Sequence, residues 1–97
     1  MGCNTLGAEI IFTFPGTNHV IQAEDILLKA GLHVQVMPLP PAIQAGCGLC
    51  LRLPPPENNN AEKLLRKHAI SPQQIYKRII KNGKSDFSIL EGEDDGE

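Results

Sequence analysis

Hydrophobic and polar positions follow two different periods along the chain, which predict strands and helices in turn. Residues 9–14 are rich in β-branched and aromatic side chains and stop at a Pro-Gly pair, as is typical of a strand followed by a turn. Apolar residues then recur at helical spacing as far as Ala30, and Gly31 follows in the place of a left-handed C-terminal cap. Thr17 or Asn18 is expected to cap the start of this helix. The first third of the chain therefore predicts a strand, a turn and a helix.

The middle of the chain predicts two more strands and a second helix. Residues 32–37 alternate between apolar and polar, residues 48–53 form a short apolar run, and prolines follow both segments. Residues 58–60 are asparagines, which together with Glu62 provide the cap chemistry of a helix start. The order up to this point is strand, helix, strand, strand, helix.

Two interpretations fit the last third. Residues 72–82 resemble a helix that begins with a capping box and a proline. Alternatively, residues 75–80 and 86–90 are strands around Asn82-Gly83, a strong hairpin signal. We favour strands, because a third helix would leave a three-stranded sheet with an unpaired edge. The expected fold is then α+β: a two-layer ferredoxin-like sandwich (βαββαβ), with both helices on one face of an antiparallel sheet.

Charge divides the chain into a mildly basic body and an acidic end. Residues 1–90 carry nine Lys and Arg against six acids, whereas five of the eleven acids lie in residues 91–97. We expect a short N-terminal tail (1–8), a single domain (9–90) and an acidic disordered tail (91–97). The acidic tail is expected to stay solvated, or else to fold over Lys77, Arg78 and Lys81 as a weak competitor for an anionic partner.

Composition limits the compartment and the partners. The N-terminus has no signal-peptide pattern and no apolar run approaches 18 residues, so we expect a cytoplasmic protein without a membrane partner. Three cysteines without a paired framework suit a reducing compartment. One tyrosine and scattered basic residues fall short of an RNA-binding sheet, so no nucleic-acid partner is expected. A homo-oligomer is left open.

The candidate chemistry lies in a proline-rich loop that carries a thiol. Residues 38–46 link two predicted strands, and Cys47 follows with a glycine on each side, so neither neighbour shields its sulfur. Cys50 lies three positions further on and completes a C-x-x-C spacing. If the third strand begins at Gly48, its leucines pack under the helices, while Cys50 and Arg52 face the open side of the sheet.

Three segments resemble a known family. They are residues 17–24 (Thr-Asn-His-Val-Ile-Gln-Ala-Glu), residues 36–40 (Val-Met-Pro-Leu-Pro), and residues 45–49 (Ala-Gly-Cys-Gly-Leu) followed by Leu51-Arg52. Together they resemble the small bacterial domains of the putative selenium/sulfur carrier protein-like family, over roughly residues 9–80. The chain departs from the family pattern in carrying Pro41 in place of an arginine, Asn18 in place of a histidine, and the additional Cys50.

The resemblance implies a cytoplasmic carrier of sulfur or selenium that works with cysteine desulfurases or other donor and acceptor proteins. Cys47 would bear the cargo, and Cys50 would be an optional resolving thiol. The residues expected to support binding are Thr17, His19, Pro38, Pro40, Gly46, Gly48, Leu49 and Arg52. Among them, the backbone amides of the loop, together with Arg52 or His19, would favour the thiolate.

Two other classes of function remain open. Cys47 and Cys50 would serve dithiol redox chemistry or bind a soft metal such as copper or zinc, although too few further ligands stand at a recognisable spacing and we expect no metal site. The loop would otherwise be a docking element of a non-catalytic interaction domain. The sequence has no phosphate-binding loop or hydrolase signature and implies no cofactor, so a carrier or binding protein is favoured over a stand-alone enzyme.

Overall fold

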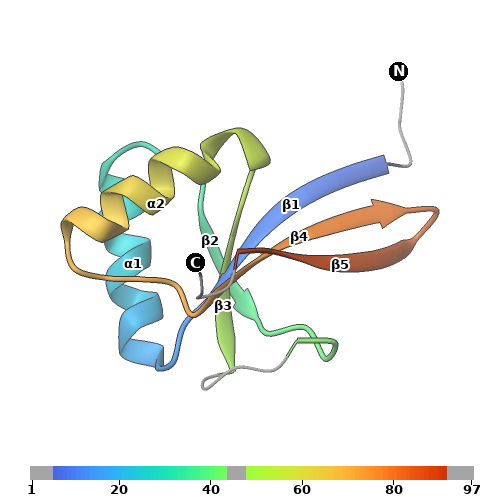
Figure 1. Ribbon diagram of the computed structural model, residues 1–97, viewed down its shortest axis with the longest axis horizontal. Coiled ribbons are helices and arrows are strands. Elements are labelled where there is room, and N and C mark those ends of the chain that lie inside the picture. The colour runs from blue at the N-terminus through green and yellow to red at the C-terminus, as the bar shows by residue number, and fades with distance from the viewer. Residues whose placement is uncertain (1–5, 44–47, 92–97) are drawn as a thin grey trace.

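Five antiparallel strands form one sheet, and two helices lie against one of its faces, in the computed structural model of the chain, which describes residues 6–43 and 48–91 (Figure 1). The elements in chain order are β1 (Leu6–Thr13), α1 (Thr17–Lys29), β2 (Gln35–Pro38), β3 (Leu49–Leu53), a 3-10 turn (Pro55–Glu57), α2 (Asn58–Lys67), β4 (Gln74–Lys81) and β5 (Lys84–Glu91). The strand order in the sheet is β2-β3-β1-β4-β5. The predicted α+β class and antiparallel sheet are confirmed.

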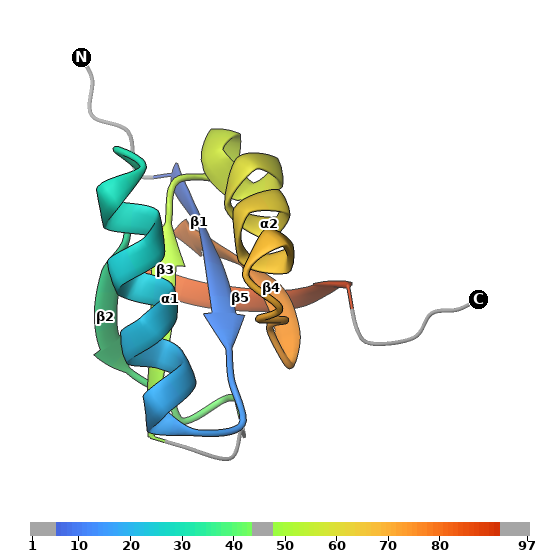
Figure 2. The same cartoon turned by 90° about the vertical axis from the view of Figure 1, so that its left-hand side faces the viewer.

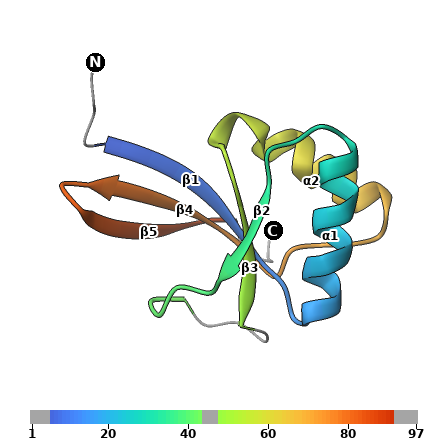
Figure 3. The ribbon, with the colours of Figure 1, turned by 180° about the vertical axis from the view of Figure 1, so that it is seen from behind.

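The sheet differs from the four-stranded ferredoxin-like arrangement that we expected. Its first four strands alternate with the helices in the predicted order, but β5 adds a fifth strand beyond β4. The two strands predicted in the last third are confirmed, and the alternative helix over residues 72–82 is wrong. Asn82 and Gly83 have positive φ angles of 53° and 80°, as a tight hairpin turn with the right-handed twist of its strands requires. The hairpin and the start of β1 project away from the helices (Figure 3).

The main core lies between the helices and the sheet face that they cover (Figure 2). The period-two pattern of the strands places alternate residues on this face, and the helices bury the stripe of apolar residues predicted from their spacing. The fully buried side chains of this core include Phe12, Phe14, Val20, Ala23, Leu27, Leu51, Ala61 and Leu65. Most of these side chains are aliphatic, and the rings of Phe12 and Phe14 pack edge to face with their centroids 6.5 Å apart.

The ends of α1 illustrate one prediction that is wrong and one that is confirmed. Gly16 is the N-cap, and no side chain caps this end of the helix, so Thr17 and Asn18 lie inside the helix instead. At the other end Gly31 has φ of 87°, and the amides of Gly31 and Leu32 bond back to the carbonyls of residues 28 and 27. This is the hydrogen-bond pattern of a Schellman C-terminal cap, which needs a left-handed residue at Gly31.

Candidate functional site

The segment between β2 and β3 leaves the sheet at the same end of the molecule as the start of α1 (Figures 1 and 2). Pro38 is the last residue of β2 and pairs with Leu49, the first residue of β3. Beyond this pair the amide of Leu39 donates to the carbonyl of Gly48 over 2.9 Å, which holds the two sides of the segment together. The predicted binding residues Pro38, Gly48 and Leu49 are thus brought together at its base.

A turn and a buried side chain fix the first half of this segment. The amide of Ile43 donates to the carbonyl of Pro40 over 3.0 Å, and the Ile43 side chain is only 4% exposed. It belongs to a second core cluster, on the sheet face opposite the helices, whose other buried members are Ile11 and Cys50. Met37, Leu39, Tyr76 and Phe87 pack around this cluster. Ile43 therefore anchors the segment on the open face of the sheet.

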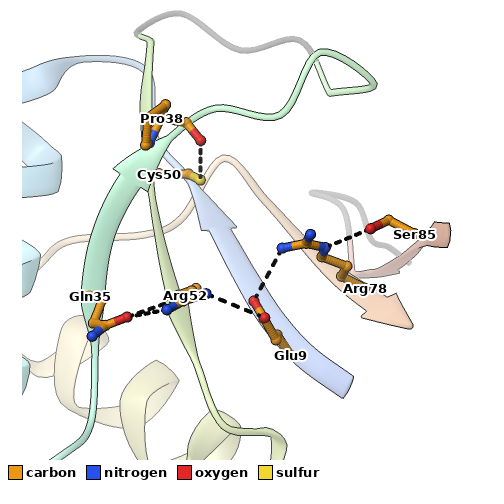
Figure 4. Close-up of polar contacts among 7 residues, drawn as sticks. All are labelled: Glu9, Gln35, Pro38, Cys50, Arg52, Arg78 and Ser85. Atoms are coloured by element: carbon orange, nitrogen blue, oxygen red, sulfur yellow. Dashed lines mark hydrogen bonds and ion pairs between the residues drawn. The ribbon is translucent and has the colours of Figure 1, made fainter. Parts of the chain in front are cut away.

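Cys50 lies beneath this anchor. It points to the face opposite the helices, as predicted, but that face is covered here and its side chain is fully buried. Its Sγ atom lies 3.9 Å from the carbonyl oxygen of Pro38, the distance of a weak thiol hydrogen bond (Figure 4). A small buried thiol among aliphatic side chains is what cysteine most often contributes to a core. A reagent would therefore reach the Cys50 thiol only when this cluster opens.

Cys47 and Gly46, the centre of the predicted site, lie outside the described residues. The described residues on either side of them are Ile43, held in the second cluster, and Gly48, held at the base of β3. The four intervening residues thus connect two fixed points at one end of the sheet. Thr17 and His19 lie in the first turn of α1, with both side chains exposed, at this same end (Figure 2).

Arg52 lies at the other end of β3. It is four residues beyond Gly48, which corresponds to about 13 Å along an extended strand. Its guanidinium is engaged there: Nε donates to Gln35 Oε1 over 2.8 Å, and Nη1 lies 3.5 Å from Glu9 Oε2. The predicted support of the Cys47 thiolate by Arg52 is therefore not favoured by the geometry.

Arg52 belongs instead to a polar row that crosses all five strands on the open face (Figure 4). Glu9 in the central strand holds Arg52 on one side and Arg78 on the other, the latter with Nη1 at 3.6 Å. Gln35 in β2 and Ser85 in β5 end the row, since Ser85 accepts a 3.1 Å hydrogen bond from Arg78. The row joins neighbouring strands by cross-strand contacts. It gives Arg52, which the sequence suggested as a partner of the thiol, a structural role in the sheet.

A contact between His33 and Glu57 was not predicted. The Glu57 carboxylate accepts a 2.7 Å hydrogen bond from His33 Nδ1 and a 2.8 Å hydrogen bond from the His33 amide. These two bonds lower the pKa of Glu57 below its usual value. They tie the chain entering β2 to the 3-10 turn before α2. Because 24 residues separate the partners, no local sequence pattern could have identified them.

A comparison with family models now adds to this geometry. Residues 9–77 match the family described as Putative Se/S carrier protein-like. The chain belongs to this family. The match confirms the resemblance seen in the sequence, and it includes Cys47 and Cys50 but not Cys3. Neither the curated proteins nor the solved structures give a match.

Within residues 6–43 and 48–91, no group of three or more His, Cys, Asp or Glu side chains is arranged to hold a metal. None of the helices in these ranges has the length and apolar character needed to cross a bilayer.

Proposed function

We propose that this protein is a sulfur or selenium carrier that presents Cys47 as the reactive thiol. The observation that carries the proposal is the burial of Cys50. The family match contains two cysteines, and one of them is enclosed by Ile43 and the sheet, so Cys47 is the thiol left to bear cargo. A thiol placed between two glycines has no neighbouring side chain to hinder a partner protein.

The proposed transfer needs no oxidant. The Cys47 thiolate attacks the terminal sulfur of a donor persulfide, the new S–S bond forms as the donor S–S bond breaks, and the donor thiolate leaves with the electron pair. The terminal selenium of a selenosulfide would be transferred in the same way. An acceptor thiolate or other nucleophile then attacks the terminal atom and regenerates the Cys47 thiolate. Donor and acceptor are partner proteins, with a cysteine desulfurase as the proposed donor.

The surroundings of the loop support this chemistry. The N-terminal end of α1 lies at the same end of the molecule, and the partial positive charge there favours a nearby anion. His19 lies in its first turn with its side chain exposed. A reducing compartment such as the cytoplasm would keep the thiol available between transfers.

Intact-protein mass spectrometry tests the proposal. The full chain is incubated with a cysteine desulfurase and cysteine, and the expected mass gain is one sulfur atom, lost on treatment with a reductant. We expect Cys47→Ser to show no gain, and Cys50→Ala and Cys3→Ser to load like the unmodified chain. Circular dichroism confirms that each variant is folded. Full loading of Cys47→Ser would refute the assignment.

A further inference from the structure

The two edges of the sheet are protected very differently. On one side β2 has four residues and ends at Pro38, and a short edge that ends in proline discourages pairing with another chain. On the other side β5 has eight residues without a proline, and no described strand or helix covers its outer edge. Of its residues 84–90 only Phe87 is partly buried. The backbone of β5 therefore offers a long row of hydrogen-bonding groups.

The side chains on β5 add an apolar surface to this edge. Ile89 is 56% exposed and Leu90 is 45% exposed, which makes them two of the four large hydrophobic side chains exposed in the described residues. Ile89 pairs with Tyr76, which in turn pairs with Ile11, so these three residues form a row across the sheet on the face opposite the helices. The row ends at solvent on the free edge, where a further strand would extend it.

The charges along the hairpin indicate that a second copy of β5 would supply this further strand. At the turn end, Lys81 and Lys84 are both exposed and line a surface hollow of about 370 Å³. At the other end, the chain continues past Glu91 with four further acids, Glu93, Asp94, Asp95 and Glu97. An antiparallel partner with this same sequence would bring its acidic end to the lysines at the turn, and the symmetry would repeat the contact.

Chain length limits how far these acids extend toward Lys84 of their own chain. Seven steps of strand separate Glu91 from Lys84, about 23 Å at the rise of a β-strand. Three of the four acids lie within four residues of Glu91, and four extended residues span at most ~14 Å. An antiparallel neighbour places its turn beside Glu91 instead. The acids therefore reach Lys84 more readily in a second copy than in their own chain, although Lys77, which pairs with Ser88, is close to the end of β5 in either case.

We propose that two copies of this chain pair through β5 in an antiparallel, two-fold symmetric arrangement that joins their sheets. A two-fold axis perpendicular to the sheet keeps each side chain on its own face of the joined sheet. Odd-numbered residues of β5 therefore lie opposite odd-numbered residues of the partner, and even-numbered residues opposite even-numbered ones. With Ser88 on the axis, Ile89 lies opposite the partner's Phe87. The apolar row of the open face then continues into the second copy.

A cross-linking experiment tests the register. Lys81 and Lys84 flank the two-residue hairpin turn and form a hydrogen-bonded pair. Hydrogen-bonded and non-hydrogen-bonded pairs alternate along the hairpin, so the backbone of Ser88 forms its hydrogen bonds with Lys77 of β4 and not with the free edge. Ser88 would then face its partner copy as a non-hydrogen-bonded pair, with a Cα separation of about 4.5 Å that a disulfide tolerates. In a chain carrying Cys3→Ser and Cys47→Ser, we expect Ser88→Cys to form a disulfide-linked dimer under mild oxidation. Asp86→Cys is the control, since its two copies would be about 13 Å apart. Equal cross-linking of both variants would overturn the register.

Sedimentation equilibrium of the full chain tests the interface itself. We expect a dimer whose dissociation constant rises at least tenfold in Ile89→Lys, because the charge replaces the apolar contact at the edge. Ile21→Lys is the matched control on α1, where Ile21 is 52% exposed, and it should leave the constant unchanged. Added salt and Lys81→Glu should each weaken the dimer if the acidic end contacts the turn. A monomer at every concentration, or a dimer broken by Ile21→Lys and not by Ile89→Lys, would overturn the proposal.

Discussion

Replacing Ile43 with alanine should uncover Cys50 without unfolding the protein. Ile43 is 4% exposed. Among the described residues of the segment between β2 and β3, it is the one that is buried in the second cluster. The substitution removes three carbon groups, worth about 2.4 kcal/mol at ~0.8 kcal/mol each. We expect the unfolding free energy to fall by about 2 kcal/mol, near the lower limit for such truncations, because the cluster lies on a sheet face without helices.

Thiol labelling measures the local part of this effect. In a chain carrying Cys3→Ser and Cys47→Ser, Cys50 is the sole thiol, and a thiol reagent can reach it only when the segment opens. If Ile43 is what closes the segment, a loss of about 2 kcal/mol should raise the labelling rate roughly 30-fold under native conditions.

Ile75→Ala is the matched control. Ile75 is also 4% exposed but belongs to the core under the helices, so its loss should lower the global stability without accelerating the labelling of Cys50. If both variants accelerate labelling equally, Cys50 is exposed by global unfolding and the anchoring role of Ile43 is refuted.

Three further outcomes are expected. Ala69 has a φ of 62° just after α2, a conformation that favours glycine, so Ala69→Gly should raise the unfolding free energy by about 0.5–1 kcal/mol. Ala30→Gly is the control: because Ala30 has a φ of −87°, this change should lower the unfolding free energy. Chemical denaturation measures both. Because hydrogen bonds from His33 lower the pKa of Glu57, the ionised carboxylate stabilises the fold above its unfolded pKa of about 4.5, and this contribution is lost as pH falls through the lower folded pKa. The stability difference between the unmodified chain and Glu57→Gln should therefore shrink below pH 4.5 in acid titrations, and a constant difference would contradict the contact. Glu9→Gln leaves Arg52 and Arg78 without their shared carboxylate. It should lower the unfolding free energy by about 1 kcal/mol, because the groups are partly exposed, and this loss should be smaller at high salt. The midpoint of thermal unfolding measures the effect.

Local patterns predicted most of the elements because the physics that forms them is local. Alternation placed Leu51 and Leu53 under the helices and Cys50 on the opposite face, as observed. The Asn-Gly turn predicted the last hairpin for the same reason, since only a few residue types favour positive φ at both turn positions.

What the sequence could not predict depends on contacts between distant residues. Ile43 is an isolated apolar residue in a proline-rich segment, so no periodic pattern marked it as buried. Its side chain nevertheless packs on the sheet face that was expected to be open at Cys50. Arg52 forms an ion pair with Glu9 on the neighbouring strand, which a sequence pattern that treats both charges as exposed does not predict. A covering residue and an ion pair across the sheet become visible only when the strand order is known.

The strand order also separates the two proposals. In the sheet β3 is three strands from β5, so in the proposed dimer seven inter-strand steps, about 34 Å, would separate the two copies of β3. Antiparallel pairing directs the two thiol loops to opposite ends of the joined sheet, because each loop adjoins the start of β3 and the strands of the second copy run the other way. Neither loop would meet the other or be covered by the interface. A chain held monomeric by Ile89→Lys should therefore accept sulfur at Cys47 as readily as the dimer, and a loss of loading in that variant would show that the edge serves the partner protein rather than a second copy.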